Sequence, residues 1–238
     1  MKTIITILIL LAFAGLYVAV MLSGGSSSIA EVSVFRDITE SHLSQPEAAQ
    51  ILPLFNLDQQ KWNGGVFRFT DITDVSYMPI KETSIGAANQ WLSNEYDRAS
   101  EIKKFDSDVT KILFDASKDK VGRWLSSVYL PIANELNNLS HSTSKRRVLL
   151  VYSDLMENDL NYSFYNNSTL NLLSKNYEIA QNKFDEMMPL ENISGIEVYL
   201  LYEPPDAVRD VRYKIVSGFY KQYLESKGAT VTISASLH

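Results

Sequence analysis

Two short, strongly apolar segments place the strongest constraint on what this chain can fold into, and the first of them is a continuous apolar run. Arg147–Ser153 reads RVLLVYS, and Ile196–Tyr202 reads IEVYLLY. A strand with one face in water would alternate polar and apolar residues, so unbroken apolar runs are typical of a parallel sheet covered on both faces. Segments with helical spacing lie between and after these runs. The sequence therefore predicts an α/β fold with an open, mostly parallel, doubly wound sheet.

The remaining strands and helices are less sharply marked. A short apolar strand, Val32–Phe35, comes first. Val66–Thr70 and Val75–Ile80 are joined by a short link, so we expect them to pair antiparallel and to supply one antiparallel edge strand. The other predicted elements are helical segments at Gln45–Gln60 (kinked or shortened by Pro53), Ile85–Phe114, Arg123–Leu139, Leu172–Met188 and Ala207–Lys227, the last capped by Gly228, and a final strand at Ala229–Ser234.

An apolar stretch, Ile4–Leu22, precedes these elements. Its length of about 19 residues would span about 28 Å as a helix, which is close to the thickness of the bilayer core. Lys2 lies before the stretch and the next basic residue is Arg36, an asymmetry that predicts a cytoplasmic N-terminus and an external domain. A cleaved signal peptide is the alternative, with Ser28-Ile29-Ala30 as its cleavage site.

These features predict the organisation of the chain. We expect residues 1–22 to be a transmembrane anchor or a signal peptide, residues 23–30 to be a Ser/Gly tether, and residues 31–238 to form one domain. The stretch is longer than the roughly 7–15 apolar residues of a signal peptide, which favours the anchor. The expected location is therefore membrane-anchored and extracytoplasmic, or secreted if the segment is cleaved.

Composition excludes several functions. The formal net charge of −6 argues against a nucleic-acid partner, because binding phosphates requires a basic surface. The chain has no cysteine, which rules out disulfides, thiol catalysis and thiolate metal ligands. Gly-rich phosphate loops and the G-x-S-x-G nucleophile elbow are both missing from the sequence. No catalytic or cofactor-binding motif stands out, and we expect a protein that is not an enzyme.

Oxygen-bearing side chains follow two of the predicted strands. Asp37, Thr39 and Ser41 form a D-x-T-x-S loop after the first strand, and Asp154 follows the strand Arg147–Ser153. In doubly wound sheets, ligands bind outside the carboxyl ends of the strands. Carboxylate and hydroxyl oxygens suit Mg²⁺, Mn²⁺ or Ca²⁺. The pattern therefore predicts a site for a hard divalent cation.

A third hydroxyl is expected from the helical segment between these strands, where Ser126 and Ser127 are adjacent. The pattern does not decide between them. An alternative interpretation is that all these side chains only cap turns and helices, which Asp, Thr and Ser often do.

The pattern resembles the von Willebrand factor A family. The metal-ion-dependent adhesion site of that family has a D-x-S-x-S loop after the first strand, a Thr before a central helix, and an Asp after the next buried strand. Asp37–Ser41 matches the first element, with Thr39 where Ser is usual. Val148–Asp154 resembles the strand ending in Ser-Asp-Gly, with Leu155 where Gly is common. Ser126, or its neighbour, falls at the position of the Thr, and the order of elements fits across residues 31–237.

The resemblance implies a function. Mg²⁺, or Mn²⁺ or Ca²⁺, would be held by Asp37, Thr39, Ser41, Ser126 and Asp154, and an acidic side chain of a protein partner would complete its coordination. The chain would then mediate metal-dependent protein–protein interaction or assembly at the cell surface. Two alternatives remain: a metal-free scaffold of the same fold, and a Mg²⁺-dependent phosphatase-like hydrolase with Asp37 as nucleophile. The hydrolase is disfavoured because Thr39 stands where such enzymes carry a second Asp.

Overall fold

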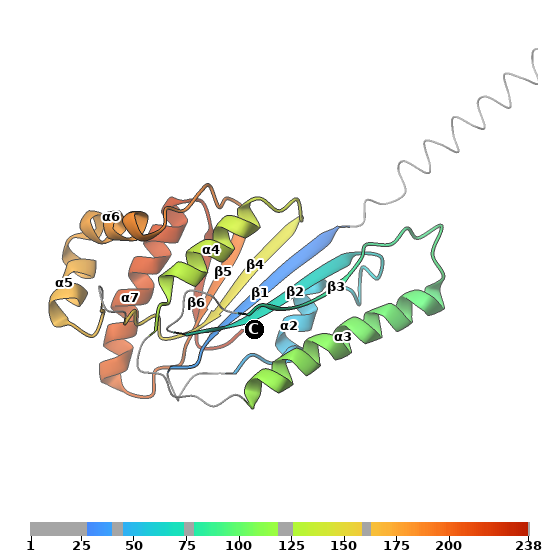
Figure 1. Ribbon diagram of the computed structural model, residues 1–238, viewed down its shortest axis with the longest axis horizontal. Helices are drawn as coiled ribbons and strands as arrows, with labels where there is room; N and C mark the ends of the chain where they lie inside the picture. The colour runs from blue at the N-terminus through green and yellow to red at the C-terminus, as the bar shows by residue number, and fades with distance from the viewer. Residues whose placement is uncertain (1–27, 40–44, 74–78, 119–125, 159–162, 238) are drawn as a thin grey trace, which may run out of the picture.

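The computed structural model describes residues 28–39, 45–73, 79–118, 126–158 and 163–237. These residues form a mixed α/β structure around a six-stranded sheet with the strand order β3-β2-β1-β4-β5-β6 (Figure 1). The strands are β1 (Ile29–Asp37), β2 (Gly64–Ile72), β3 (Lys81–Ile85), β4 (Arg146–Tyr152), β5 (Ile196–Leu201) and β6 (Thr230–Ser234).

The sheet is parallel except at one edge. β1 pairs in parallel with both β2 and β4, and β5 and β6 continue the parallel pairing outward from β4. β3 pairs antiparallel with β2 and forms the edge. This confirms the predicted mostly parallel sheet with one antiparallel edge strand. After building outward from β1 to β3, the chain returns to the other side of β1, so the strand order reverses between β1 and β4.

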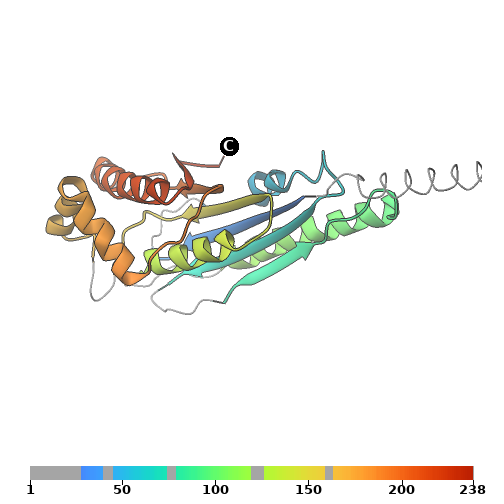
Figure 2. The ribbon, with the colours of Figure 1, turned by 90° about the horizontal axis from the view of Figure 1, so that it is seen from above.

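Helices pack against both faces of the sheet. Their bounds are α2 (Ala48–Ile51), the 3₁₀-helix η1 (Leu52–Phe55), α3 (Glu95–Ser117), α4 (Tyr129–Ser140), α5 (Asn167–Lys175), α6 (Tyr177–Met187) and α7 (Ala207–Ser226). Figure 2 shows α3 and α4 on opposite sides of the sheet. In Figure 1, α5, α6 and α7 gather beside β5 and β6, whereas α3 lies beside β2 and β3.

The core is correspondingly divided into two clusters. In β4, Val148 and Leu150 join the cluster that includes α2, η1 and α3, whereas Leu149 and Val151 join the cluster that includes α4 to α7. All four side chains are fully buried. Because successive strand residues point to opposite faces, this alternation explains why β4 reads as a continuous apolar run.

The antiparallel edge strand was placed wrongly by the sequence pattern. The prediction was Val75–Ile80, but the strand is β3 at Lys81–Ile85, and residues 74–78 lie outside the described residues. β3 reads KETSI and buries only its last residue. An edge strand with a largely exposed face needs few apolar residues, so apolar periodicity does not mark it.

The predicted helices also differ from those observed. α3 begins at Glu95 rather than Ile85, which is the last residue of β3, and α4 begins at Tyr129, after the non-helical residues 126–128. Gln45–Gln60 contains only α2 and η1, and Pro53 lies in the first turn of η1, in keeping with the expected effect of proline. Leu172–Met188 is divided between α5 and α6 at Asn176, whose φ of −136° and ψ of 62° are not helical. Asn hydrogen-bonds readily to nearby backbone outside helices, which favours a break at such a position.

The predicted membrane segment Ile4–Leu22 lies outside the described residues. Among the residues that the structure does describe, no helix combines the length and apolar character needed to cross a bilayer.

Candidate functional site

The candidate site lies at the carboxyl edge of the sheet, where β1 and β4 end side by side. Asp37 is the last residue of β1 and Tyr152 is the last of β4. The parallel register pairs Arg36 with Tyr152, so Ser153 follows alongside Asp37. The Ser153 hydroxyl donates to Asp37 Oδ2 at 2.9 Å. The site therefore sits where the strand order reverses, which is where open α/β sheets bind ligands.

Asp37 is a buried carboxylate surrounded by neutral donors. Asp37 is only 2% exposed. Oδ1 accepts hydrogen bonds from the Thr39 amide at 2.9 Å and the Thr39 hydroxyl at 2.6 Å. Oδ2 accepts from Ser153 and, at 3.4 Å, from the Ser126 hydroxyl. No Lys, Arg or His among the described residues forms an ion pair with it.

This environment shifts the acidity of Asp37. Burial raises the pKa of the carboxyl above its ordinary value of 3.8, because the charged form loses solvation, and the hydrogen bonds from Thr39, Ser153 and Ser126 offset only part of that effect. A buried carboxylate without a cationic partner is an unfavourable arrangement that a bound divalent cation would relieve.

Ser126 is the serine that reaches Asp37. Its backbone exchanges two hydrogen bonds with Asn158, at 3.1 and 2.9 Å, which holds the segment before α4 against the loop after β4. Ser127 donates its amide to the Thr73 carbonyl at 3.2 Å, and its buried hydroxyl has no hydrogen-bond partner in the described part of the chain. Of the two serines proposed to supply the third hydroxyl, Ser126 contacts Asp37. Ser127 follows it directly in the sequence.

Asp154 lies two residues beyond the end of β4 and lines a pocket beside Ser153. It is 7% exposed, and its Oδ1 accepts from the Met156 amide at 2.9 Å. Leu155 follows with a φ of +61°, in the left-handed region that favours glycine. Asp154 is thus presented from a tight turn immediately next to Ser153, which binds Asp37.

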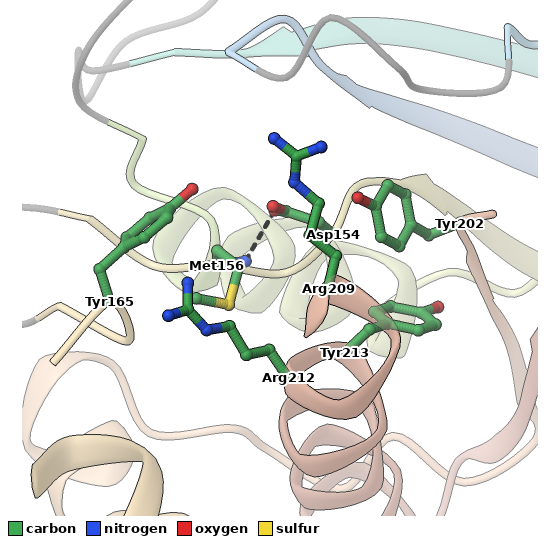
Figure 3. A pocket seen from close by; sticks show the side chains of 7 residues that line it. All are labelled: Asp154, Met156, Tyr165, Tyr202, Arg209, Arg212 and Tyr213. Atoms are coloured by element: carbon green, nitrogen blue, oxygen red, sulfur yellow. Dashed lines mark hydrogen bonds between the residues drawn. The ribbon is translucent and has the colours of Figure 1, made fainter. Parts of the chain in front are cut away.

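A pocket of about 160 Å³ opens beside Asp154 (Figure 3). It is lined by Asp154, Met156, Tyr165, Tyr202, Arg209, Arg212 and Tyr213. In Figure 3, Arg209 and Arg212 both extend from α7 towards the Asp154–Met156 segment, and Tyr165 lies on the other side of Met156. The pocket therefore combines two guanidinium groups with phenol rings next to one of the predicted metal-binding residues.

Two residues that the sequence analysis missed help to build this edge. The Ser153 hydroxyl donates to Asp37 and accepts a hydrogen bond from the Leu155 amide at 2.8 Å. It therefore links the Asp37 carboxylate to the turn that follows Asp154. Glu157 is fully buried, and its Oε2 accepts the amides of Val128 and Tyr129 at 2.9 and 2.8 Å, which holds the start of α4. Ser153 could have been noticed because it directly precedes Asp154. Nothing in the sequence near Glu157 marks it as a helix-capping acid.

The structure thus brings together three predicted ligands: Asp37, Thr39 and Ser126. Asp154 is on the adjacent strand end, and Ser41 lies outside the described residues. Within the described ranges, no three His, Cys, Asp or Glu side chains converge. A cation at this edge would therefore depend on hydroxyl oxygens as well as carboxylates, and Thr39, Ser126 and Ser153 supply such oxygens in a set that fits Mg²⁺, Mn²⁺ or Ca²⁺.

No protein-family model matches this chain, and no curated protein sequence matches it significantly. Function is therefore inferred from the fold and from the side chains at the carboxyl edge of the sheet.

Proposed function

We propose that this chain is an exported, membrane-tethered domain of the von Willebrand factor A type that binds a protein partner in a metal-dependent manner. The chain order of its elements supports this: strand, helix, strand pair, helices, strand, helices, strand, helix, strand. Helices on both faces and a reversal of strand order between β1 and β4 favour the doubly wound arrangement.

The environment of Asp37 carries this proposal. The carboxylate is buried at the reversal point, accepts hydrogen bonds from Thr39, Ser153 and Ser126, and has no cationic partner among the described residues. A carboxylate kept only for structure would more commonly be exposed or paired with Arg or Lys. Neutral oxygens around a buried acid instead suit a divalent cation.

Asp37, Thr39, Ser41, Ser126 and Asp154 would hold Mg²⁺, or Mn²⁺ or Ca²⁺, in this site. The bound cation supplies a Lewis-acidic position for a carboxylate oxygen of the partner. The protein residues fix the site: Ser153 orients the Asp37 carboxylate, and the bridge between Ser126 and Asn158 holds the serine in place.

The turn after Asp154 also favours the family resemblance. Leu155, which stands where that family commonly has Gly, adopts a left-handed backbone conformation. The conformation that glycine would provide is therefore present here with a different side chain.

The pocket beside Asp154 indicates the chemistry of the partner. Arg209 and Arg212 line it in a protein whose net charge is −6. Guanidinium groups bind carboxylates with two parallel hydrogen bonds, and Tyr residues are enriched at interfaces. An acidic segment of the partner would therefore be attracted to the pocket and to the cation together.

A metal-free scaffold of the same fold is the competing interpretation, and a titration of the full chain with Mn²⁺ separates the two. Unbound Mn²⁺ is followed by its electron paramagnetic resonance signal, for wild type, Asp37→Asn and Asp154→Asn. We expect one bound ion in wild type, and an affinity at least about tenfold lower in both variants, because each loses a charged oxygen ligand.

Asp185→Asn serves as the matched control. This half-buried carboxylate accepts from Tyr223 and Lys227, away from the candidate site, so its loss should leave Mn²⁺ binding unchanged. Absence of binding by wild type at millimolar Mn²⁺, or equal binding by Asp37→Asn, would contradict the proposed metal site.

A further inference from the structure

Three large side chains are exposed together near the start of α3. Trp91 is 67% exposed, Leu92 is 74% exposed and Tyr96 is 87% exposed. These three residues are called the Trp91 patch below. Single exposed apolar residues are common on proteins, but Trp, Leu and Tyr within six positions of one another form a surface that favours an apolar or interfacial environment.

The backbone under the patch is held by local hydrogen bonds. The Trp91 amide donates to Asn89 Oδ1 at 2.8 Å, and the Leu92 amide donates to the Asn89 carbonyl at 3.1 Å. The Tyr96 amide donates to Asn94 Oδ1, which caps α3. These bonds fix the turn so that the three side chains project into solvent.

The patch lies at the end of the molecule where β1 begins. The Ser28 amide donates to Asn63 Oδ1 at 3.0 Å, and Arg98, in the first turn of α3, donates to the carbonyls of Asn63 and Lys61. Ser28 and the start of α3 therefore contact the same short loop. Figure 1 shows the start of β1 and the adjacent end of α3 at one end of the sheet.

The length of chain before Ser28 limits how far this end can lie from the predicted anchor. Leu22, the last residue of the apolar stretch, precedes Ser28 by six positions. Even a fully extended chain would cover only about 20 Å over that distance. With Ile4–Leu22 in a bilayer, the start of β1 must stay near the lipid surface, and the Trp91 patch with it.

We propose that the Trp91 patch inserts into the lipid interface beside the membrane anchor. This inference rests on the anchor in the proposed function. Trp and Tyr favour the boundary between lipid and water, and the Leu92 side chain would be buried among acyl chains. Lys61 forms an ion pair with Glu95, the residue before Tyr96, so this carboxylate is offset by a positive charge.

The patch would also orient the domain. β1 has nine residues and so spans about 30 Å. With the amino end of the sheet against the membrane, Asp37 and the candidate metal site at the opposite end would face away from it, open to a partner.

Quenching of tryptophan fluorescence by brominated lipid tests this inference on the full chain, which has three tryptophans and none in the apolar stretch. The chain is reconstituted in phosphatidylcholine vesicles with and without brominated acyl chains. We expect Trp91→Phe to remove most of the bromolipid-dependent quenching. Trp62→Phe, which alters a half-buried ring in the adjacent loop, should leave it nearly unchanged.

Flotation of the same vesicles distinguishes failure of the membrane anchor from failure of the proposed patch insertion. If the chain does not float with lipid, the anchor is wrong and so is the inference. If the chain floats but quenching is the same in wild type and Trp91→Phe, the anchor stands and the inserted patch is overturned. A patch that instead binds another protein would give that second result.

Discussion

The backbone conformation of one residue, Leu155, shapes the turn at the candidate site. This leucine is fully buried yet has a φ of +61°, which is unfavourable for any residue with a Cβ atom. Its amide donates to Ser153, and its carbonyl accepts the Glu157 amide at 3.0 Å. These bonds and the burial of the leucine side chain stabilise the turn that presents Asp154.

Replacement of Leu155 should therefore reverse the usual ranking of glycine and alanine. Both Leu155→Gly and Leu155→Ala should lower the free energy of unfolding by about 2–5 kcal/mol through loss of the buried side chain. The glycine variant should be the more stable of the two by about 1 kcal/mol, because alanine keeps the left-handed strain and glycine does not. Urea unfolding measures the difference. An alanine variant as stable as the glycine variant, or more so, would contradict this account of the turn.

Some site residues could be predicted from the sequence and others could not. Asp37, Thr39 and Asp154 follow apolar strands at positions that a pattern can mark. Ser153 was read as the end of its strand, although its hydroxyl binds Asp37. Glu157 acts on the start of α4, about 30 positions earlier, and only the folded arrangement of the chain shows that contact.

At the scale of whole elements, α4 packs against the sheet through a buried carboxylate, Glu135. The Ser33 hydroxyl of β1 donates to Glu135 Oε1 at 2.5 Å. Arg68 of β2 is 3.8 Å from Glu135 but is closer to Glu31 and Glu82, at 2.9 and 2.8 Å. Burial consequently dominates, and it raises the pKa of the Glu135 carboxyl above its ordinary value of 4.5.

The raised pKa of Glu135 predicts how stability depends on pH. The folded state binds this proton more tightly than the unfolded state, so the contribution to stability is present below about pH 4.5 and is lost as the pH rises through the folded-state pKa. Glu135→Gln, which mimics the protonated form, should therefore be more stable than wild type at pH 7, with a gap that closes towards pH 4. Thermal unfolding across this range measures the gap, with the exposed Glu186→Gln as control. A Glu135→Gln variant that is less stable than wild type at pH 7 would contradict the assigned effect of burial.

Elements with strong apolar patterns could be predicted, and elements that depend on tertiary contacts could not. β4 is buried on both faces over its last five residues, and β5 is buried except at the half-buried Glu197 and Tyr199, so their composition identifies both as strands. β3 is held at the edge by pairing with β2 and carries mostly polar side chains, so its position could not be read from periodicity.

At the scale of the molecule, the two ends of the sheet differ in chemistry. The amino end carries the Trp91 patch and the start of β1, and the carboxyl end carries Asp37, Asp154 and the arginine-lined pocket. The apolar runs predicted the parallel sheet, but the order of its strands is set by pairings between distant segments that composition does not specify. The proposed division into a membrane-facing end and a partner-binding end depends on that order.

Thermal unfolding of the full chain with EDTA or Mg²⁺, for wild type and Asp37→Asn, tests the metal site most directly. Mg²⁺ at 100 times its dissociation constant should add about 2.7 kcal/mol to the stability of wild type, a rise of roughly 5–10 °C in Tm. In Asp37→Asn, whose affinity is expected to be at least about tenfold lower, the same addition should contribute no more than about 1.4 kcal/mol, so the rise in Tm should fall to about half or less. No rise in wild type at millimolar Mg²⁺, or an equal rise in both proteins, would contradict metal binding at Asp37.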